Sequence, residues 1–369
     1  MLNPKTGERE LAYIVQIDET QKLIGYDNVH YVKILGWWCV APVELKKGDV
    51  AVYFEVDSLL PKEDTRFAFM EKRKYRVRPI RLCKVISQGL VIGIKDFPEL
   101  KDMAVGSFVT DMLHIVHFDD ELIEQPSSSF IIKKKKNIVF DWLMRFSMFR
   151  KLYFFFNKKE KKKSWPDFVP KTDEERIQNI PNVMKLDEKW IITEKIDGCS
   201  STYALDKKND FYVCSRNIRL GESEQNKSSV WWKNAERYKL LDVLKEIKKE
   251  HKLSTVAIQG ESYGYKIQNR DYSLGNKTDL AVFHIYFDGK LLPIQDMIEL
   301  CKSYHLPHVH VYNWKYEMPE NIESIIAFID KTESVIDRKE IEGLVFYSQD
   351  GQTHFKCVSP SFILKYHGK

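Results

Sequence analysis

The sequence contains few cysteines, and none of them is arranged as a close pair. Six occur among 369 residues, without a single CxxC spacing. This scarcity excludes a disulfide framework, argues against a zinc-ribbon site, and is typical of proteins that keep their thiols reduced. The polar first ten residues, MLNPKTGERE, carry no signal-peptide pattern. We therefore expect an intracellular protein, cytoplasmic or nuclear.

The sequence also lacks a long uninterrupted apolar run. The aromatic stretch at residues 139–156 is broken by Asp141, Arg145, Arg150 and Lys151, whereas a membrane-spanning helix needs about 20 consecutive, mostly apolar residues. We predict no transmembrane segment. A basic amphipathic helix on a membrane surface is one interpretation of this stretch. A linker helix that docks one domain on another is favoured over it.

A strong excess of one charge is absent as well. The 58 Lys and Arg residues nearly balance the 53 Asp and Glu residues, and the net charge is +5. The basic residues are clustered, however, which favours contact with a polyanion more than the total charge does. The length predicts two domains with a connection between them, and the 43% hydrophobic content is sufficient to form real cores.

The first part of the chain, to about Leu113, consists of short β-rich runs separated by turns. The runs LAYIVQID, VHYVKIL, WWCVAP, VAVYFEV and GLVIGI predict a small β-barrel such as an OB-fold over residues 1–120. Within it, residues 72–81 alternate basic with apolar side chains. This pattern predicts a strand whose cationic face follows a nucleic-acid backbone, although a solvated charged strand would show the same pattern. The predicted nucleic-acid contacts are Lys72, Arg73, Lys74, Arg76, Arg78 and Arg81.

The stretch from Trp190 to Tyr203 is the one around which the second part is organised. It predicts a strand, a tight glycine turn containing Lys195, Asp197 and Gly198 (KIDG), and a return strand. A lysine at such a turn, between two sheets, is expected to have its pKa lowered by desolvation and neighbouring cations. A partly neutral lysine can form a covalent intermediate. The alternative is a surface hairpin with an exposed lysine.

The second domain, residues 171–369, is predicted to be α+β with antiparallel sheets, and a basic, aromatic linker over 121–170 precedes it. A capping-box pattern from Thr172 to Glu175 predicts the start of a helix. Further helices are expected over 228–250, 296–305 and 321–332, and strands over 256–264, 280–289, 341–346 and 354–358.

Six charged side chains occupy the ends of otherwise apolar strands in this domain. Buried charge requires a partner or a ligand. Three cations beside three carboxylates suit a triphosphate with a divalent metal, because cations hold phosphate oxygens and carboxylates hold the hydrated ion. Structural ion pairs are the alternative. The six residues are Lys195, Asp197, Arg216, Glu261, Glu342 and Lys356.

The order of the blocks EKIDG, SRN, QGE, VFHIYF, EGLVF and FK resembles the successive motifs of the covalent nucleotidyltransferases, which include ATP-dependent DNA and RNA ligases and mRNA capping enzymes. Only thirteen residues follow Lys356, too few for the OB domain that DNA ligases and capping enzymes carry there. With the barrel first, and with YFEVDSLLP, ISQGL and PKTDEERIQN, the chain is similar to the Deinococcus-type RNA ligase family over essentially its whole length.

The resemblance implies an ATP-dependent RNA ligase that uses Mg²⁺ or Mn²⁺. It would seal 3′-OH and 5′-phosphate ends at nicks in an RNA or RNA/DNA duplex, and no protein partner is predicted. Lys195 would be the nucleophile that becomes lysyl-AMP. Asp197, Glu261 and Glu342 would hold the metal ion, mainly through water, and Lys356 would contact the α-phosphate.

The same resemblance implies an ATP-binding set. Phe283 would stack on adenine, with Tyr286 or Phe287 as alternatives, and Glu194 would read the edge of the base. The implied ATP-binding residues are Glu194, Lys195, Asp197, Gly198, Arg216, Glu261, Phe283, Glu342 and Lys356.

Two arginines and one departure from the family pattern complete these expectations. Arg216 would contact the ribose or the 5′-phosphate of the strand, and Arg176 the leaving pyrophosphate or the nick phosphate. Related ligases often end in KxK, whereas the second position here is Val358, so Lys365 is a candidate substitute. A DNA-only ligase and a non-catalytic RNA-end-binding protein are the alternatives. The histidines of HLPHVH and HIVH are interpreted as incidental, because no cysteine or carboxylate completes a zinc set.

Overall fold

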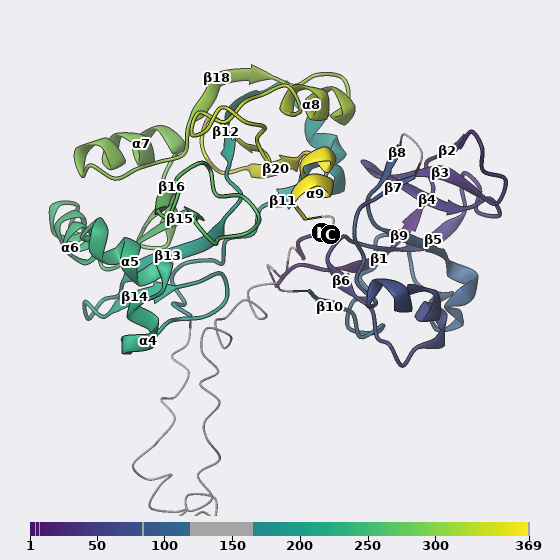
Figure 1. Cartoon of the computed structure of the whole chain (residues 1–369), viewed down its shortest axis with the longest axis horizontal. Coiled ribbons are helices and arrows are strands. Elements are labelled where there is room, and N and C mark those ends of the chain that lie inside the picture. Colours follow the sequence, from purple (N-terminus) through teal and green to yellow (C-terminus); the bar gives the residue numbers. More distant parts are fainter. Residues whose placement is uncertain (4, 7, 83–84, 119–164, 368–369) are drawn as a thin grey trace, which may run out of the picture. The chain divides into compact units, whose positions relative to one another are not determined.

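The structure, a computed structural model, describes residues 1–3, 5–6, 8–82, 85–118 and 165–367 (Figure 1). The predicted linker helix over 139–156 lies outside the described residues, and so does most of the predicted linker, 121–170. In the described part of the chain, no helix is both long and apolar enough to cross a membrane.

The N-terminal region consists of short antiparallel strands, as its turn spacing predicts. They form three-stranded sheets in the orders β1-β5-β9 and β2-β3-β4 and the pairs β7-β8 and β10-β6 (Figure 1). The strands are β1 (Ala12–Gln16), β2 (Glu19–Lys22), β3 (Val29–Ile34), β4 (Trp37–Pro42), β5 (Val50–Phe54), β6 (Ser58–Leu59), β7 (Ile80–Leu82), β8 (Val85–Ser87), β9 (Leu90–Gly93) and β10 (Val116–His117). The 3₁₀ helices are η1 (Thr65–Arg73), η2 (Ile94–Asp96) and η3 (Pro98–Leu100).

The strands β1 and β5 are buried on both faces, which explains their continuous apolar sequences. Ile14 and Phe54 point into one apolar cluster, while Tyr13 and Tyr53, one position earlier in each strand, point into another. This alternation follows from the two-residue period of a strand. The region therefore has two apolar layers, one on each side of β1 and β5.

The predicted basic strand over residues 72–81 is wrong. Lys72 and Arg73 end the 3₁₀ helix η1, and Lys74 and Tyr75 then take φ values of 53° and 58°. Such left-handed residues cannot belong to an extended strand, so only Ile80–Leu82 is extended, as β7. The basic side chains therefore do not share one strand face.

The C-terminal region is built on two five-stranded sheets, in the orders β11-β20-β19-β12-β18 and β14-β13-β15-β16-β17. Their pairings are antiparallel, as predicted, except that β11 runs parallel to β20. The strands are β11 (Glu175–Arg176), β12 (Lys189–Lys195), β13 (Cys199–Leu205), β14 (Phe211–Cys214), β15 (Val256–Gly264), β16 (Thr278–Phe287), β17 (Lys290–Leu291), β18 (Val311–Glu317), β19 (Gly343–Tyr347) and β20 (His354–Val358).

The two sheets face each other across an apolar layer. Ile191 on β12 and Val345 on β19 pack with Ile258 on β15. The next residue of β12, Ile192, points to the opposite face and packs with Ile325 of α8 (Ile322–Ile329). Because β12 is covered on both sides, its sequence is an apolar run, and Lys195 lies at its half-buried C-terminal end.

The predicted helices over 228–250, 296–305 and 321–332 are confirmed, the first as two helices. The capping-box prediction at Thr172 to Glu175 is wrong, because this segment leads into β11 and a 3₁₀ helix. The helices are α4 (Glu224–Lys227), α5 (Val230–Arg237), α6 (Leu240–Glu250), α7 (Ile294–Ser303), α8 and α9 (Pro360–Tyr366), and the 3₁₀ helices are η4 (Ile177–Asn179) and η5 (Pro181–Lys185).

Candidate active site

Lys195 and Glu342 form the centre of the site. Lys195 is the last residue of β12 and pairs with Gly343 across the ladder, which places the preceding Glu342 beside it. Lys195 Nζ donates a hydrogen bond to Glu342 Oε2 at 2.8 Å. Burial acts to lower the pKa of Lys195, but the charges of Glu342 and Glu261 outweigh burial and raise the pKa above its ordinary value. The expectation of a lowered pKa is therefore wrong, because the strongest electrostatic partners of the amine are carboxylates and not cations.

Asp197 follows two residues later and is held on two sides. Its backbone N–H donates to the hydroxyl of Tyr272 at 2.6 Å, and its Oδ1 lies 3.1 Å from Nε2 of His367. Burial acts to lower the pKa of His367, but the carboxylate of Asp197 outweighs burial and raises it. The other oxygen of Asp197, Oδ2, is buried and has no hydrogen-bond partner among the described residues. A buried acceptor of this kind suits the water shell of a metal ion.

Glu261 reaches the same place from the second sheet. It lies on β15 opposite Ser200 of β13, and its charge acts directly on Lys195. The turn between β12 and β13 passes very close to β15: a Cβ on Gly198 would overlap the Ser262 carbonyl oxygen and lie 2.9 Å from Cγ of Glu261. There is thus no room for a side chain at Gly198. A glycine at this position allows the turn after Lys195 to approach the strand that carries Glu261.

Replacing Gly198 by alanine is expected to separate these two strands. The added methyl group overpacks a buried contact, so we expect a loss of about 1–3 kcal/mol in the free energy of unfolding and a lower rate of any reaction that needs Lys195 and Glu261 together. Urea denaturation measures the first effect. If Gly198→Ala unfolds at the wild-type urea concentration, the close approach is not a constraint on the fold.

A second group of charges surrounds Asp173. Lys356 Nζ lies 3.2 Å from Asp173 Oδ1, and Arg216 Nη2 lies 3.6 Å from Asp173 Oδ2. Arg9 of the N-terminal region adds two hydrogen bonds to the same carboxylate, at 2.8 and 3.1 Å. Burial lowers the pKa of Lys356 below its ordinary value even though Asp173 acts to raise it. Lys356 also acts electrostatically on Lys195, so the two charged groups belong to one site.

Glu194 and Phe283, the residues expected to bind adenine, lie in different surroundings. The buried carboxylate of Glu194 accepts hydrogen bonds from the Tyr312 hydroxyl at 3.0 Å and from Ser334 Oγ at 2.5 Å, and burial raises its pKa. Phe283 on β16 is half-buried against the core between the sheets. Their roles toward a nucleotide remain predictions.

Two other predicted residues have their partners elsewhere. The guanidinium of Arg176 lies 5.7 Å from the ring centre of Trp37, in the N-terminal region. Lys365 forms an ion pair with Glu340 and is exposed. The structure therefore places neither side chain in contact with the group around Lys195.

Sequence reasoning missed Asp173 and His367. The capping pattern assigns Asp173 to a helix cap. Its position in PKTDEER, in the segment that precedes the strand ending at Lys195, is the sequence feature that could have indicated a role in the site. His367 lies 170 positions from Asp197, and no local pattern points to it.

Comparisons with known proteins agree with this geometry. Residues 188–367 match the protein family described as RNA ligase, and residues 11–94 match a family described as an OB-fold domain. The comparison with curated proteins found no match. The OB-fold predicted for the N-terminal region is thereby confirmed, and the first match contains Lys195 together with all of its predicted carboxylate partners.

Solved structures of Naegleria gruberi RNA ligase are similar over the whole chain. The one with pyrophosphate is 27% identical with a TM-score of 0.78, and the match covers 98% of this chain and 100% of that one. A substituted form with AMP and Mn is 28% identical with a TM-score of 0.79, at the same coverages. Another substituted form, with ATP and Mn, is 27% identical with a TM-score of 0.78, again at 98% and 100%. The predicted combination of an OB-fold with an α+β nucleotidyltransferase domain is confirmed.

Proposed function

We propose that the chain, an ATP-dependent RNA ligase whose residues 188–367 match the RNA ligase family, seals 3′-OH/5′-phosphate breaks at duplex nicks. The observation that carries the proposal is the half-buried contact of 2.8 Å between Lys195 and Glu342 inside the matched domain. In this proposal residues 1–120 form the OB module and residues 171–369 the adenylyltransferase domain.

The first step uses Lys195 as the nucleophile. After losing a proton, its Nζ attacks the α-phosphorus of ATP; an N–P bond forms, the bond to the bridging oxygen of the β-phosphate breaks, and pyrophosphate leaves. Lys356 and Arg216 provide cations for phosphate oxygens, and both lie within reach of Asp173. Asp173 therefore orients the two cations when no phosphate competes for them.

The carboxylates fit a divalent ion. Glu261 and Glu342 act on Lys195, and Asp197 acts on Glu342. The buried Oδ2 of Asp197 is an acceptor without a partner among the described residues. We assign these three residues to a hydrated Mg²⁺ or Mn²⁺, held mainly through water. When bound, such an ion supplies positive charge that lowers the lysine pKa and balances the charge of the reacting phosphate.

The remaining steps transfer and release AMP. The 5′-phosphate of a strand attacks the lysyl-AMP phosphorus and frees Lys195, and a 3′-OH then attacks the activated 5′-phosphate and expels AMP. Arg76 is unsuited to phosphate contact, because it is buried in an ion pair with Asp57 at 2.7 Å. Exposed basic side chains are proposed to contact the RNA backbone. They are Lys72, Arg73, Lys74 and Arg81.

An intracellular location is part of the same proposal. Five cysteines of the described residues are free and buried. Burial raises the pKa of Cys39, Cys301 and Cys357 among them, which keeps these thiols protonated. Buried free thiols fit a reducing compartment.

Joining of a nicked duplex tests the function. Two duplexes differ only in the sugar at the 3′-OH end, ribose in one and deoxyribose in the other, and both carry a labelled 5′-phosphate. Because the 2′-OH distinguishes RNA from DNA, we expect the ribose end to be joined at least about tenfold faster, a difference of about 1.4 kcal/mol in the barrier. The unannealed strands serve as the control for duplex preference. Equal rates for both sugars would indicate a ligase without RNA specificity, and failure to join any nick would refute nick sealing.

A further inference from the structure

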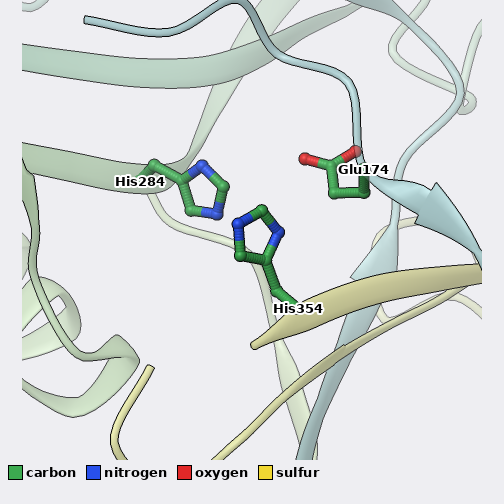
Figure 2. Close-up of side chains that lie close together, drawn as sticks. All are labelled: Glu174, His284 and His354. Atoms are coloured by element: carbon green, nitrogen blue, oxygen red, sulfur yellow. The ribbon is translucent and has the colours of Figure 1, made fainter. Parts of the chain in front are cut away.

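Three side chains that the ligase mechanism does not use converge within the C-terminal region. Glu174, His284 and His354 each place one potential ligand atom so that all three atoms lie within 4.8 Å of one another. Figure 2 shows the carboxylate and the two imidazoles meeting from three separate segments. Glu174 directly precedes β11, His284 lies on β16 and His354 begins β20.

His284 is buried and His354 is half-buried, and three of their ring nitrogens are buried without a hydrogen-bond partner among the described residues. His284 is 3% exposed, and neither of its ring nitrogens has a partner among the described residues; Nδ1 of His354 is also buried and without a partner there. The two rings are 5.0 Å apart between centres. A buried polar atom without a partner is costly, and three such atoms in one place indicate that something else satisfies them.

The charges at this place favour a cation over a proton. Burial, and then the neighbouring His354, lower the pKa of His284 to about 3, so the ring stays neutral and keeps a lone pair for a metal. Glu174 is ionised more readily than usual: burial acts to raise its pKa, but nearby positive charge, chiefly that of Lys356, outweighs burial and lowers it. The neutral imidazole of His284 and the ionised carboxylate of Glu174 are thus available together.

We propose that Glu174, His284 and His354 bind a zinc ion, in a site distinct from that of Asp197, Glu261 and Glu342. Two histidines and one glutamate are an established zinc ligand set that leaves room for a water as the fourth ligand. With Zn–N and Zn–O distances of about 2.0–2.2 Å, two ligand atoms lie at most about 4 Å apart. The largest separation, 4.8 Å, therefore has to contract by at least about 1 Å, which requires rotation of the side chains.

The position of this site assigns it a structural role. His284 belongs to the sheet of β13, β15 and β16, whereas His354 belongs to the sheet of β12, β19 and β20. Glu174 enters from the segment that also carries Asp173. A zinc ion would connect the two sheets to each other and to the segment that holds Lys356 through Asp173. Binding to the folded state alone must then raise the thermal stability of the chain.

Metal binding by the full chain tests the proposal. The protein is stripped with a chelator, saturated with Mg²⁺ to occupy the carboxylates around Lys195, and titrated with Zn²⁺ against a chromophoric chelator and with Co²⁺ by visible absorption. We expect one equivalent of Zn²⁺, a Co²⁺ spectrum of low coordination number, and a higher melting temperature with Zn²⁺. We expect His284→Gln, His354→Gln and Glu174→Gln each to weaken binding at least about tenfold. They should also abolish the thermal shift.

The exposed His251 provides the matched control. His251→Gln should bind Zn²⁺ like the wild type, since its ring packs against Phe287 at a 45° tilt and is not among the clustered ligands. Circular dichroism of each variant separates lost binding from lost folding, and Glu174→Gln, which changes one atom of a half-buried side chain, is the variant best suited to keep the fold. Zn²⁺ affinity that is unchanged in Glu174→Gln and His354→Gln, or no Zn²⁺ held by the wild type, would overturn the proposal.

Discussion

Replacing Lys195 by alanine is expected to abolish the transfer of labelled AMP from ATP to the protein, with a loss of at least about 1,000-fold. The amine is the only group in this proposal that forms the bond to AMP, and no nearby side chain can take its position at the end of β12. Incubation with α-labelled ATP and Mg²⁺ or Mn²⁺, followed by a denaturing gel, measures the covalent product.

Lys365→Ala is the matched control, because this lysine is exposed and paired with Glu340. The amount of labelled AMP on Lys365→Ala should equal that on the wild type. A large loss of label would instead support Lys365 as the substitute for the second lysine of the last motif. Because Glu342 and Glu261 raise the pKa of Lys195, the amine is protonated at neutral pH, and the labelling rate should rise about tenfold per pH unit below that pKa. A label on Lys195→Ala equal to that on the wild type would remove the lysine from the mechanism.

The sequence was sufficient to predict most strands and to place Lys195 and Glu342 at strand ends. Alternating or continuous apolar runs bounded by glycine turns marked β1, β5, β12 and β15, because burial of one or both faces imposes those patterns. The sequence predicts that Lys195 and Glu342 belong to one site, since each lies at the end of such an apolar run. These features depend on local spacing and on the resemblance to a family.

The failures share a physical cause, which is that distant partners decided the local structure. The capping pattern at Thr172 to Glu175 is a local signal, but Asp173 and Glu175 are used by Arg9, more than 160 positions away, and the helix does not form. The basic segment breaks at Lys74, where a left-handed turn of non-glycine residues has no reliable local signal. The histidines of the proposed zinc site are 70 positions apart on two strands, so spacing rules for metal motifs could not find them.

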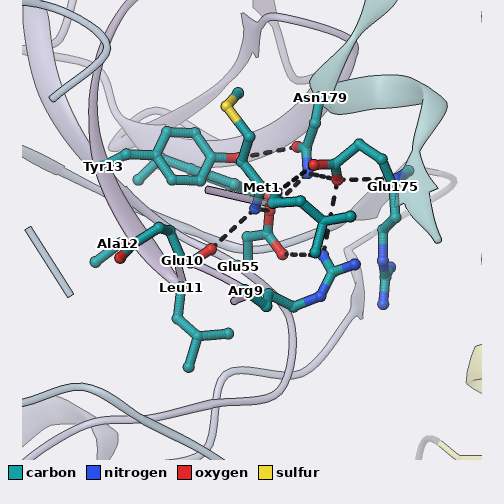
Figure 3. Close-up of polar contacts among 12 residues, drawn as sticks. Met1, Arg9, Glu10, Leu11, Ala12, Tyr13, Glu55, Glu175 and Asn179 are labelled. Atoms are coloured by element: carbon teal, nitrogen blue, oxygen red, sulfur yellow. Dashed lines mark hydrogen bonds and ion pairs between the residues drawn. The ribbon is translucent and has the colours of Figure 1, made fainter. Parts of the chain in front are cut away.

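Replacing Arg9 by alanine is expected to lower the free energy of unfolding by about 3–5 kcal/mol, because several buried carboxylates lose their counter-charge together. The guanidinium binds Asp173 through two hydrogen bonds and Glu55 Oε2 at 3.0 Å, and it lies 3.8 Å from Glu175 Oε1. Figure 3 shows Arg9 below Glu55 and Glu175, and Asn179 Nδ2 donates hydrogen bonds to both of these carboxylates, at 2.7 and 2.8 Å. Urea denaturation of the variant and the wild type measures the difference.

Arg66→Ala is the control for this prediction. Arg66 also binds two carboxylates, Asp64 and Glu99, but it is more exposed, so its loss should cost no more than about 1 kcal/mol. The loss of unfolding free energy in Arg9→Lys should lie between those of Arg9→Ala and Arg66→Ala, because an ammonium cannot reproduce the paired hydrogen bonds of the guanidinium. Equal losses for Arg9→Ala and Arg66→Ala would contradict the view that burial makes the first pair strong.

The same network sets how stability depends on acidity. Burial acts to raise the pKa of Glu55, but the charge of Arg9 and other cations outweigh burial and lower it from 4.5 to about 2. A carboxylate with a lowered pKa in the folded state contributes stability that is complete above its ordinary pKa and is lost as the pH falls between the two values. The wild type should therefore lose stability steeply between about pH 5 and pH 2. The free energy of unfolding of Arg9→Ala should be lower at neutral pH and should fall less over that range, because the pKa of Glu55 moves back toward its ordinary value once the guanidinium is gone. Parallel curves of stability against pH for the two proteins would show that Arg9 does not set the charge state of Glu55.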